Sequence, residues 1–356
     1  AGAADMRAAT VRTLDTTSPR ALEAGQPDRA KGAASAMEFS NNLVTIFGGA
    51  GFIGTQLVQV LTDRGYRIRV AVRRPDLAGH VKPLGMVGQV MPIQANIRNR
   101  DSVERAIRGA SIVVNLVGIG HESGKQRFRA VHAQGARNIA EAATALGVEH
   151  LVHVSAIGAD AQSPSSYARS KALGESEVLS AFSSAVVIRP SIVFGPGDGF
   201  INLYGKLARL LPVLPVIGGK SRFQPLYVGD LALAIAAAAE GAVKGGRTYE
   251  LGGPEVVSHT ELVKRVVAGT GRTNPVVPLP AGVAKLLALP LSLLPAPLIT
   301  GDQVELLQAD NVVSEAAIRD KRTLAAFGVA PTAMGAILPG YLWRYMRHGQ
   351  FDRQAA

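Results

Sequence analysis

The chain has 356 residues, of which 47% are apolar, and it carries a formal net charge of +11 at pH 7. It contains no Cys, which excludes disulfides, thiolate metal sites and cysteine nucleophiles and favours an intracellular protein. The basic residues are spread along the chain and only 5% of residues are aromatic, which argues against a nucleic-acid partner; attraction to anionic surfaces, such as membrane headgroups or an acidic subunit, explains the charge.

The N-terminal 40 residues differ from the rest of the chain. Residues 1–40 are rich in Ala, Arg, Thr and Ser and show no apolar periodicity, which predicts a mobile extension. A mitochondrial presequence has a similar composition but few acids, so Asp5 and Asp15 count against one. The most apolar stretch, residues 281–299, carries Lys285 and three prolines, and we do not expect it to cross a bilayer.

Between residues 41 and 190, short apolar runs alternate with helical patterns, as a parallel sheet with crossover helices requires. This alternation predicts an α/β fold with a doubly wound parallel sheet, a Rossmann domain over 41–190. Residues 191–356 are expected to form a smaller C-terminal α+β part, a docking or substrate-type region interleaved with that domain. The expected strands are 43–47, 67–72, 89–93, 111–117, 150–154 and 185–189, and the expected helices are 52–64, 101–108, 126–146, 167–181, 200–210, 230–240, 258–269 and 302–320.

The stretch FGGAGFIG, which starts at residue 47, joins the first expected strand to the first helix. Its glycines satisfy the spacing G-x-x-G-x-x-G at Gly48, Gly51 and Gly54, and also the shorter G-x-G-x-x-G that starts one residue later. In a dinucleotide fold such glycines allow the tight turn, the approach of the pyrophosphate and close packing of helix on strand. The helix N-terminus, at Phe52 and Ile53, then faces the phosphates. An ordinary turn is the alternative, but the further strand–helix units favour a dinucleotide site.

The end of the second expected strand distinguishes NAD from NADP. An NAD site places Asp or Glu there to bind the ribose 2′-hydroxyl, whereas an NADP site needs cations for a 2′-phosphate. Arg73 and Arg74 occupy this place, and guanidinium groups pair well with phosphate. The alternative is that both arginines are simply solvated. Because no Asp or Glu occupies their place at the strand end, the sequence predicts NADPH.

Tyr167 and Lys171, in the stretch YARSK, lie four residues apart at the start of an expected helix and so share one face. A neighbouring ammonium favours the phenolate and brings the phenol into range for proton transfer to or from a carbonyl or alcohol. The same Lys can hold the nicotinamide ribose. An exposed helix surface is the alternative, but the position after the fifth strand of a dinucleotide fold favours the functional interpretation.

The stretches FGGAGFIG, YARSK, VIRPSIVFGPGDGF and PLYVGDLALAI together resemble the extended or atypical short-chain dehydrogenase/reductase family, over about residues 41–260. The resemblance implies that residues after the third and fourth strands contact adenine and ribose, and that those after the sixth lie beside the nicotinamide. At position 96, where this family commonly has Asp, the chain has Asn96, whose side chain still accepts a hydrogen bond. The implied contacts are Asn96, Ile97, Leu116, Val117, Gly118, Pro190 and Ile192.

A second departure from the family bears on catalysis. Active members carry a Ser or Thr after the fifth strand that polarises the substrate carbonyl. In HVSAIGAD the aligned residue is Ile157, while Ser155 lies two residues earlier and is either that hydroxyl or a strand-end residue near the cofactor. The resemblance thus implies a vestigial catalytic pair, Tyr167 and Lys171.

Within the family, the chain is similar to the NADPH-binding accessory subunits of respiratory complex I, of the alpha-subcomplex subunit nine type, and their bacterial relatives. The shared stretches include TIFGGAGFIG, SSYARSKALGE, RPSIVFGPGD and GYLWRYMRHG. This resemblance implies a structural NADPH, other complex I subunits as partners, and a peripheral place on the inner membrane, on the cytoplasmic side in a bacterium or the matrix side in a mitochondrion. A soluble NADP-dependent reductase, or a sugar-nucleotide epimerase or dehydratase, is the alternative that Tyr167 and Lys171 favour.

The remaining polar residues indicate no further site. His150 and His153 point to opposite faces of a strand and no carboxylate pair completes a metal site, so no metal is expected. Asp230 is expected to cap a helix and Glu250 to end a strand. Trp343 lies among Tyr and Arg near the C-terminus, a mixture suited to an interface with protein or headgroups or to a helix packed on its own domain.

Overall fold

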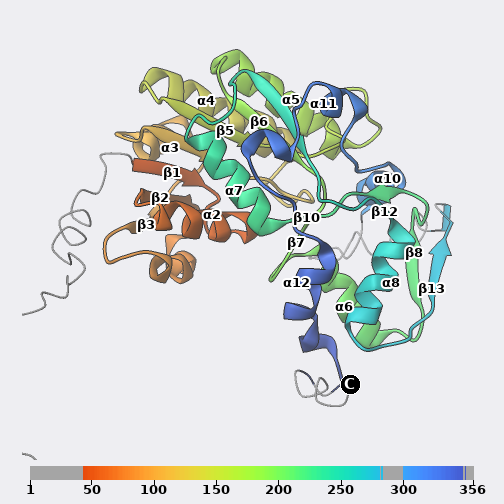
Figure 1. Ribbon diagram of the computed structural model, residues 1–356. Coiled ribbons are helices and arrows are strands. Elements are labelled where there is room, and N and C mark those ends of the chain that lie inside the picture. The colour runs from red at the N-terminus through yellow and green to blue at the C-terminus, as the bar shows by residue number, and fades with distance from the viewer. Residues whose placement is uncertain (1–42, 281, 284–299, 348, 350–356) are drawn as a thin grey trace, which may run out of the picture. The chain divides into compact units, whose positions relative to one another are not determined.

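A seven-stranded sheet forms the core of the molecule (Figure 1). The computed structural model describes residues 43–280, 282–283, 300–347 and 349, so the expected extension 1–40 and most of the apolar stretch 281–299 lie outside the described residues. Every pairing in this sheet is parallel and the strand order is β11-β6-β5-β4-β1-β2-β3, which confirms the predicted α/β fold. The strands are β1 (Leu43–Phe47), β2 (Arg67–Val72), β3 (Val90–Gln94), β4 (Ile112–Asn115), β5 (His150–Val154), β6 (Val186–Pro190) and β11 (Arg247–Leu251).

Helices cover both faces of the sheet. On one face α2 (Phe52–Asp63) packs against α7 (Val228–Ala239), and on the other α4 (Gly135–Ala145) packs against α3 (Arg100–Ile107) and α5 (Ser166–Ala181). Successive side chains of a strand point to opposite faces, so Ile46 is buried in the core under α2 and α7, and Phe47 in the core under α3 and α4.

The structure corrects the sequence prediction at several elements. The expected helix 126–146 begins as a π-helix, η2 (Arg129–Gln134), before α4, and the expected helix 302–320 is two helices, α10 (Gly301–Gln308) and α11 (Glu315–Arg319). Between these two, Asn311 forms a β-bridge with Phe223, which breaks the helical pattern. The range of strand β11 was not predicted, although a strand end was expected at Glu250, and the 3₁₀ helix η1 (Pro75–Leu84) was not predicted at all.

The part of the chain between α5 and the C-terminus builds a second core beside the sheet. Helices α6 (Phe200–Leu210), α8 (His259–Gly269) and α12 (Met334–Leu342) enclose buried aromatic and aliphatic side chains. Three two-stranded sheets, β7–β10, β9–β12 and β8–β13, accompany them. The remaining bounds are β7 (Val193–Phe194), β8 (Leu214–Ile217), β9 (Arg222–Phe223), β10 (Leu226–Tyr227), β12 (Val257–Ser258), β13 (Val276–Leu279), η3 (Leu324–Phe327) and η4 (Trp343–Tyr345).

The polar residues that the sequence placed outside any site have structural partners. Asp230 lies in the first turn of α7 but accepts hydrogen bonds from the backbone N and Oγ1 of Thr332, at 2.6 and 2.9 Å, so the expectation of a helix cap is wrong. Glu250 lies in β11 near its end, as expected, and accepts from the Ser314 backbone. Within the described residues, no helix is long and apolar enough to span a bilayer.

Candidate functional site

The glycine-rich loop follows the carboxyl end of β1 and leads directly into α2. Gly48 has φ of +81°, a conformation that L side chains rarely adopt, and the Gly51 amide donates to the Gly48 carbonyl at 3.0 Å. A Cβ on Gly54 would lie 2.5 Å from the Gly49 Cα, so only glycine permits this close packing of helix on loop. A Cβ on Gly49 would lie 3.1 Å from Val70 Cγ1, so the first glycine of each spacing has a structural reason.

The loop leaves the start of α2 open for an anion. Gly51 is the N-cap residue and no side chain caps the helix, so the first amides, from Phe52 onward, have no side-chain acceptor. A Cβ at Gly51 would meet only the Gly48 carbonyl, at 3.3 Å. The N-terminus of a helix with free amides and a glycine in front of it is a site for a phosphate group.

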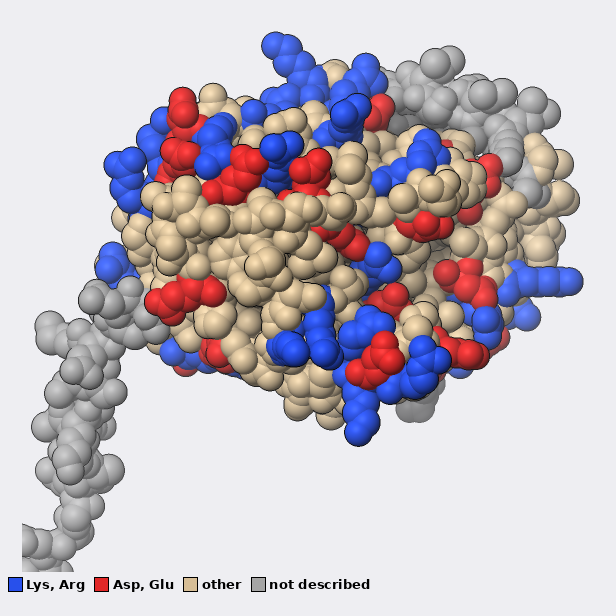
Figure 2. Space-filling model, turned by 90° about the horizontal axis from the view of Figure 1, so that it is seen from above, with Lys and Arg blue, Asp and Glu red and all other residues tan. Residues whose placement is uncertain are grey.

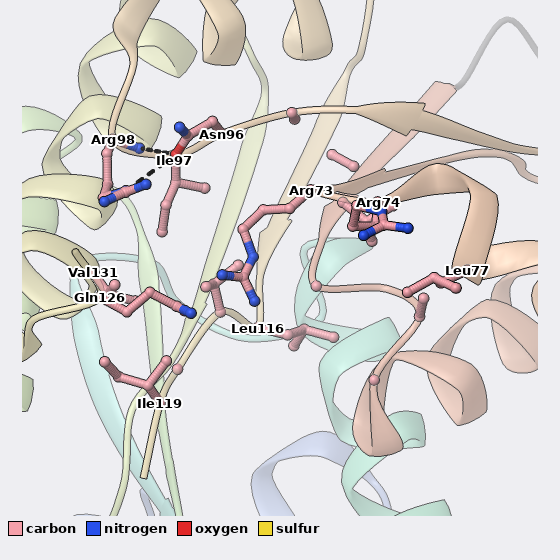
Figure 3. Close-up of a pocket in the computed structure, with 18 residues that line it drawn as sticks. Arg73, Arg74, Leu77, Asn96, Ile97, Arg98, Leu116, Ile119, Gln126 and Val131 are labelled. Atoms are coloured by element: carbon pink, nitrogen blue, oxygen red, sulfur yellow. Dashed lines mark hydrogen bonds between the residues drawn. The ribbon is translucent and has the colours of Figure 1, made fainter. Parts of the chain in front are cut away.

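A cavity of about 400 Å³ lies against this loop, at the carboxyl ends of β1 to β4 (Figure 3). Nine of the predicted cofactor residues line it: Gly48, Gly51, Arg73, Arg74, Asn96, Ile97, Leu116, Val117 and Gly118. Leu77, Arg98, Ile119 and Gln126 also line it and were not predicted. Seven predicted residues are not among its lining: Phe52, Ile53, Gly54, Tyr167, Lys171, Pro190 and Ile192.

The two arginines after β2 differ in their surroundings. Figure 3 shows Arg73 extending among the lining residues, whereas Arg74 lies to the side, near Leu77. The Arg74 guanidinium forms a two-pronged ion pair with Asp76, with Nη2 to Oδ2 at 2.7 Å and Nε to Oδ1 at 3.0 Å. Asp76 thus engages Arg74, an ion pair that the sequence interpretation did not consider. Arg73 is the cation directed into the cavity.

Asn96, after β3, is held in place by a neighbour. Its Oδ1 accepts from the Arg98 backbone at 3.2 Å and from Arg98 Nε at 3.4 Å, and Arg98 Nη1 donates to the Lys125 carbonyl at 2.7 Å. Figure 3 shows the two bonds to Asn96 at the rim of the cavity. These bonds fix Asn96 and the guanidinium of Arg98 together in the cavity wall.

Tyr167 and Lys171 lie in the first two turns of α5. Burial and the nearby Asp302 carboxylate raise the pKa of Tyr167 to about 12, and burial lowers the pKa of Lys171 to about 8. Lys171 Nζ donates to the Val154 carbonyl at 2.9 Å. Burial and a carboxylate thus act on the Tyr167 phenol in the direction opposite to the influence expected from Lys171.

His132, in the π-helix η2, joins the cavity wall to α5. Its Nε2 accepts from the Ile119 backbone at 3.0 Å, so Nδ1 carries the proton and donates to Ser170 Oγ at 2.8 Å. Its ring meets that of Tyr167 edge to face, with centroids 5.4 Å apart. Burial and the charge of Lys171 lower the pKa of His132 to about 3, which keeps the ring neutral. No local sequence pattern indicated this link, because His132 and Ser170 lie 38 residues apart in the chain.

Ser155 follows β5, and its buried Oγ has no hydrogen-bond partner among the described residues. The Nε2 of His153, two residues earlier and so on the same face of the strand, is also buried without one. Ile157 is buried and its amide donates to the Pro190 carbonyl at 3.0 Å, so this position offers no side-chain donor to a substrate. Buried polar atoms normally have a hydrogen-bond partner, so the Ser155 hydroxyl, next in the chain to the Val154 carbonyl that Lys171 binds, is free to bind a ligand.

Two residues far along the chain complete the surroundings of this site. Asp302 of α10 accepts from Ser165 Oγ at 2.9 Å and from the Ser166 amide at 2.6 Å, at the start of α5. Asn311 Oδ1 accepts from the Ile192 amide at 2.8 Å, just after β6. Each lies more than a hundred residues from its partners, so local sequence patterns could not indicate them.

The features together fit a dinucleotide: a left-handed glycine turn, an open helix N-terminus, a cavity with Arg73 directed into it, and an unpartnered Ser155 hydroxyl beside Lys171. No group of three or more His, Cys, Asp or Glu suited to a metal occurs within the described part of the chain. The fold and the site define a nucleotide-binding Rossmann protein.

Comparison with known proteins specifies the family. Residues 44–252 match the NAD dependent epimerase/dehydratase family, and the chain belongs to it. It is 34% identical over 302 residues to NADH dehydrogenase [ubiquinone] 1 alpha subcomplex subunit 9, mitochondrial, of Arabidopsis thaliana, covering 81% of this chain and 75% of that protein. It is also 34% identical over 198 residues to the ceramide reductase of Caulobacter vibrioides, covering 56% of this chain and 61% of that protein.

The fold is shared with solved structures. The UDP-glucose 4-epimerase of Thermus thermophilus, solved as a complex with NAD, superimposes with a TM-score of 0.62. The alignment covers 88% of this chain and 100% of the epimerase, at 24% sequence identity. At that identity the likeness concerns the fold alone.

Proposed function

We propose that the chain is an NADPH-binding accessory subunit of respiratory complex I, in which the nucleotide stabilises the fold and is not turned over. The similarity to the alpha subcomplex subunit 9 over 81% of the chain carries this proposal, and the cavity with Arg73 directed into it supports NADPH as the nucleotide. A ligand that binds only the folded state raises stability by linkage. The subunit would lie peripherally on the inner membrane, in contact with other subunits and with headgroups, on the cytoplasmic side in a bacterium or the matrix side in a mitochondrion.

Association with complex I is tested by comigration. When membranes are solubilised in mild detergent and separated on a native gel, we expect the chain in the band that stains for NADH:quinone oxidoreductase activity. A chain that migrates only at the size of a free protein, from membranes in which that band is intact, would contradict the assignment.

The surroundings of Tyr167 support the absence of turnover. Proton transfer by a phenol is efficient when its pKa lies near the working pH, and here burial and Asp302 raise the pKa of Tyr167 to about 12. The aligned carbonyl-polarising position is Ile157, which is apolar and buried. Both the proton donor and the electrophilic partner of the family's reaction are thus impaired.

We expect the purified protein to leave NADPH essentially unoxidised in the presence of simple ketones, aldehydes or sugar nucleotides. The physical reason is the missing donor at Ile157, since loss of one such donor costs on the order of a hundredfold in rate. The measurement is the absorbance of the reduced nicotinamide over time. Sustained oxidation that disappears in Tyr167→Phe would overturn this expectation.

The second candidate is an NADP-dependent reductase, which the ceramide reductase relative and the retained Tyr167 and Lys171 favour. A sugar-nucleotide epimerase or dehydratase has only the likeness of fold in its favour. For the reductase, the unpartnered Ser155 hydroxyl would supply the polarising donor that Ile157 lacks. Ser155→Ala therefore distinguishes the two candidates wherever any oxidation of NADPH is observed.

A further inference from the structure

Three segments of the C-terminal part meet in what we call the tip: the end of α6 with the loop 210–213, the loop 270–275 between α8 and β13, and residues 343–347 after α12 (Figure 1). Asn274 Nδ2 donates to the carbonyl of Leu211 at 2.7 Å and to that of Ala208 at 3.2 Å. Arg272 Nε donates to the Tyr345 carbonyl at 3.3 Å. The tip is therefore one hydrogen-bonded surface.

The loop of the tip exposes large apolar side chains in succession. Leu210 is 76% exposed, Leu211 37% and Val213 43%, with Pro212 between them. The preceding residues of α6 behave differently, because Ile201 and Ala208 are buried in the C-terminal core. Single exposed apolar residues are common on protein surfaces, but a run at the end of an amphipathic helix indicates an interaction surface.

The sequence that builds the tip contains no acidic residue. Stretches 199–221, 262–301 and 331–349 hold no Asp or Glu, although the chain has 27 of them. The exposed cations of the tip are Lys206, Arg209, Arg344 and Arg347. The face of the molecule in Figure 2 differs from the tip, because Lys and Arg there are interspersed with Asp and Glu.

The cations of separate segments lie close together. Tyr345 is anchored by its hydroxyl to Asn202 Oδ1 at 2.6 Å and by its ring against Gly205 of α6. Arg344 precedes Tyr345 directly, and Arg209 lies one helical turn after Gly205 in α6, so the packing of Tyr345 on Gly205 brings the two segments together. Burial and the Asp198 carboxylate raise the pKa of Tyr345, while the charges of Arg344 and Arg209 lower it. The nearest acid in the chain before α6, Asp198, is buried and bonded to Tyr341.

We propose that the tip docks on an anionic phospholipid bilayer, with Arg209, Arg344 and Arg347 at the headgroup phosphates and Leu210, Leu211 and Val213 in the interface. Cations that surround exposed apolar side chains are typical of segments that lie in the plane of a bilayer surface. An acidic protein surface would pair with the cations of the tip, but it would not explain why Leu210, Leu211 and Val213 are exposed beside them. The inference rests on the proposed peripheral place at the inner membrane and names the surface and the lipid charge for it; because its test uses the isolated chain and vesicles, it can fail while membership of complex I still holds.

The test is sedimentation of the purified full chain with vesicles of phosphatidylcholine alone and of phosphatidylcholine with phosphatidylglycerol at about two to one. We expect binding to the anionic vesicles, weakened by added salt, and little binding to the neutral ones. The triple variant Arg209→Gln, Arg344→Gln, Arg347→Gln is expected to bind about a hundredfold more weakly, at roughly fivefold for each cation near the surface. Leu210→Ser with Val213→Ser should weaken binding as well and leave its salt dependence unchanged.

A matched variant removes three exposed cations far from the tip: Arg105→Gln, Lys244→Gln and Arg247→Gln. It has the same net charge as the tip variant, so it is expected to retain most of the binding. Equal losses in the two triple variants, or no binding of the unmodified chain to anionic vesicles, would overturn the proposal and direct attention to an acidic protein partner. Thermal unfolding of each variant, with a midpoint like that of the unmodified chain, shows that the tip variants are folded.

Discussion

Replacing Gly51 by Val is expected to abolish nucleotide binding while leaving the ligand-free fold nearly unchanged. Gly51 has φ of −84° and ψ of −179°, which any residue adopts, and its Cβ would meet only one atom, the Gly48 carbonyl, at 3.3 Å. The added side chain would instead stand in front of the α2 N-terminus, where the pyrophosphate approaches. We therefore expect no measurable NADPH affinity.

Thermal unfolding with and without NADPH provides the readout. At nucleotide concentrations about a hundredfold above its dissociation constant, the unmodified chain should gain on the order of 5 °C in melting temperature, and Gly51→Val should gain nothing. Gly54→Val is the contrasting variant, because its Cβ would lie 2.5 Å from the Gly49 Cα. It should lower the melting temperature without any nucleotide. An undiminished NADPH-dependent gain in Gly51→Val would contradict the site.

The same variant separates a structural nucleotide from a reacting one. In cells, Gly51→Val is expected to reduce the amount of assembled complex I or the share of this chain in it, because the nucleotide-free domain is less stable. Tyr167→Phe keeps the ring that packs on His132 and Phe128 and removes only a hydroxyl, so it should assemble normally. Normal assembly of a Gly51→Val chain that binds no nucleotide would refute the structural role.

The sequence predicted the sheet well because the information was local. Each of β1 to β6 lies within or close to a short apolar run of the sequence, so ranges such as 43–47 and 67–72 coincide with β1 and β2. The range of strand β11 was not predicted, because β11 pairs with β6 across a long stretch of chain that includes α6 and α7. A strand that joins a sheet from so far along the chain has no local signal of its neighbour.

The candidate site was predictable to a similar degree. The glycine loop and the strand ends carry their signal within a few residues, and the structure brings nine of those residues around one cavity. The burial of Tyr167 could not be predicted from the sequence, and it raises the pKa of the phenol, whereas Lys171 was expected to lower it. Contacts such as Asp302 with the start of α5 span 137 residues and lie beyond any local pattern. The ion pair of Arg74 with Asp76, only two residues apart, was within reach of sequence reasoning.

That ion pair leads to the second large effect, which concerns the choice between NADPH and NADH. Arg73→Ala is expected to weaken NADPH binding by tenfold to about a hundredfold, because a charge-assisted contact to phosphate contributes about 1.5 to 3 kcal/mol. NADH lacks the 2′-phosphate, so its affinity should be unchanged. Titration of each nucleotide against each variant, followed by fluorescence of the reduced nicotinamide, gives both values.

Arg74→Ala is the matched control, since it removes the same side chain one residue further on. The Arg74 guanidinium already pairs with Asp76 and lies at the edge of the cavity near Leu77, so its loss should weaken NADPH only severalfold. Asp76→Ala frees this guanidinium for a phosphate and should strengthen NADPH binding without affecting NADH. Equal affinities of the unmodified chain for NADPH and NADH would refute the assignment of a 2′-phosphate site, and a larger loss in Arg74→Ala than in Arg73→Ala would exchange the roles of the two arginines.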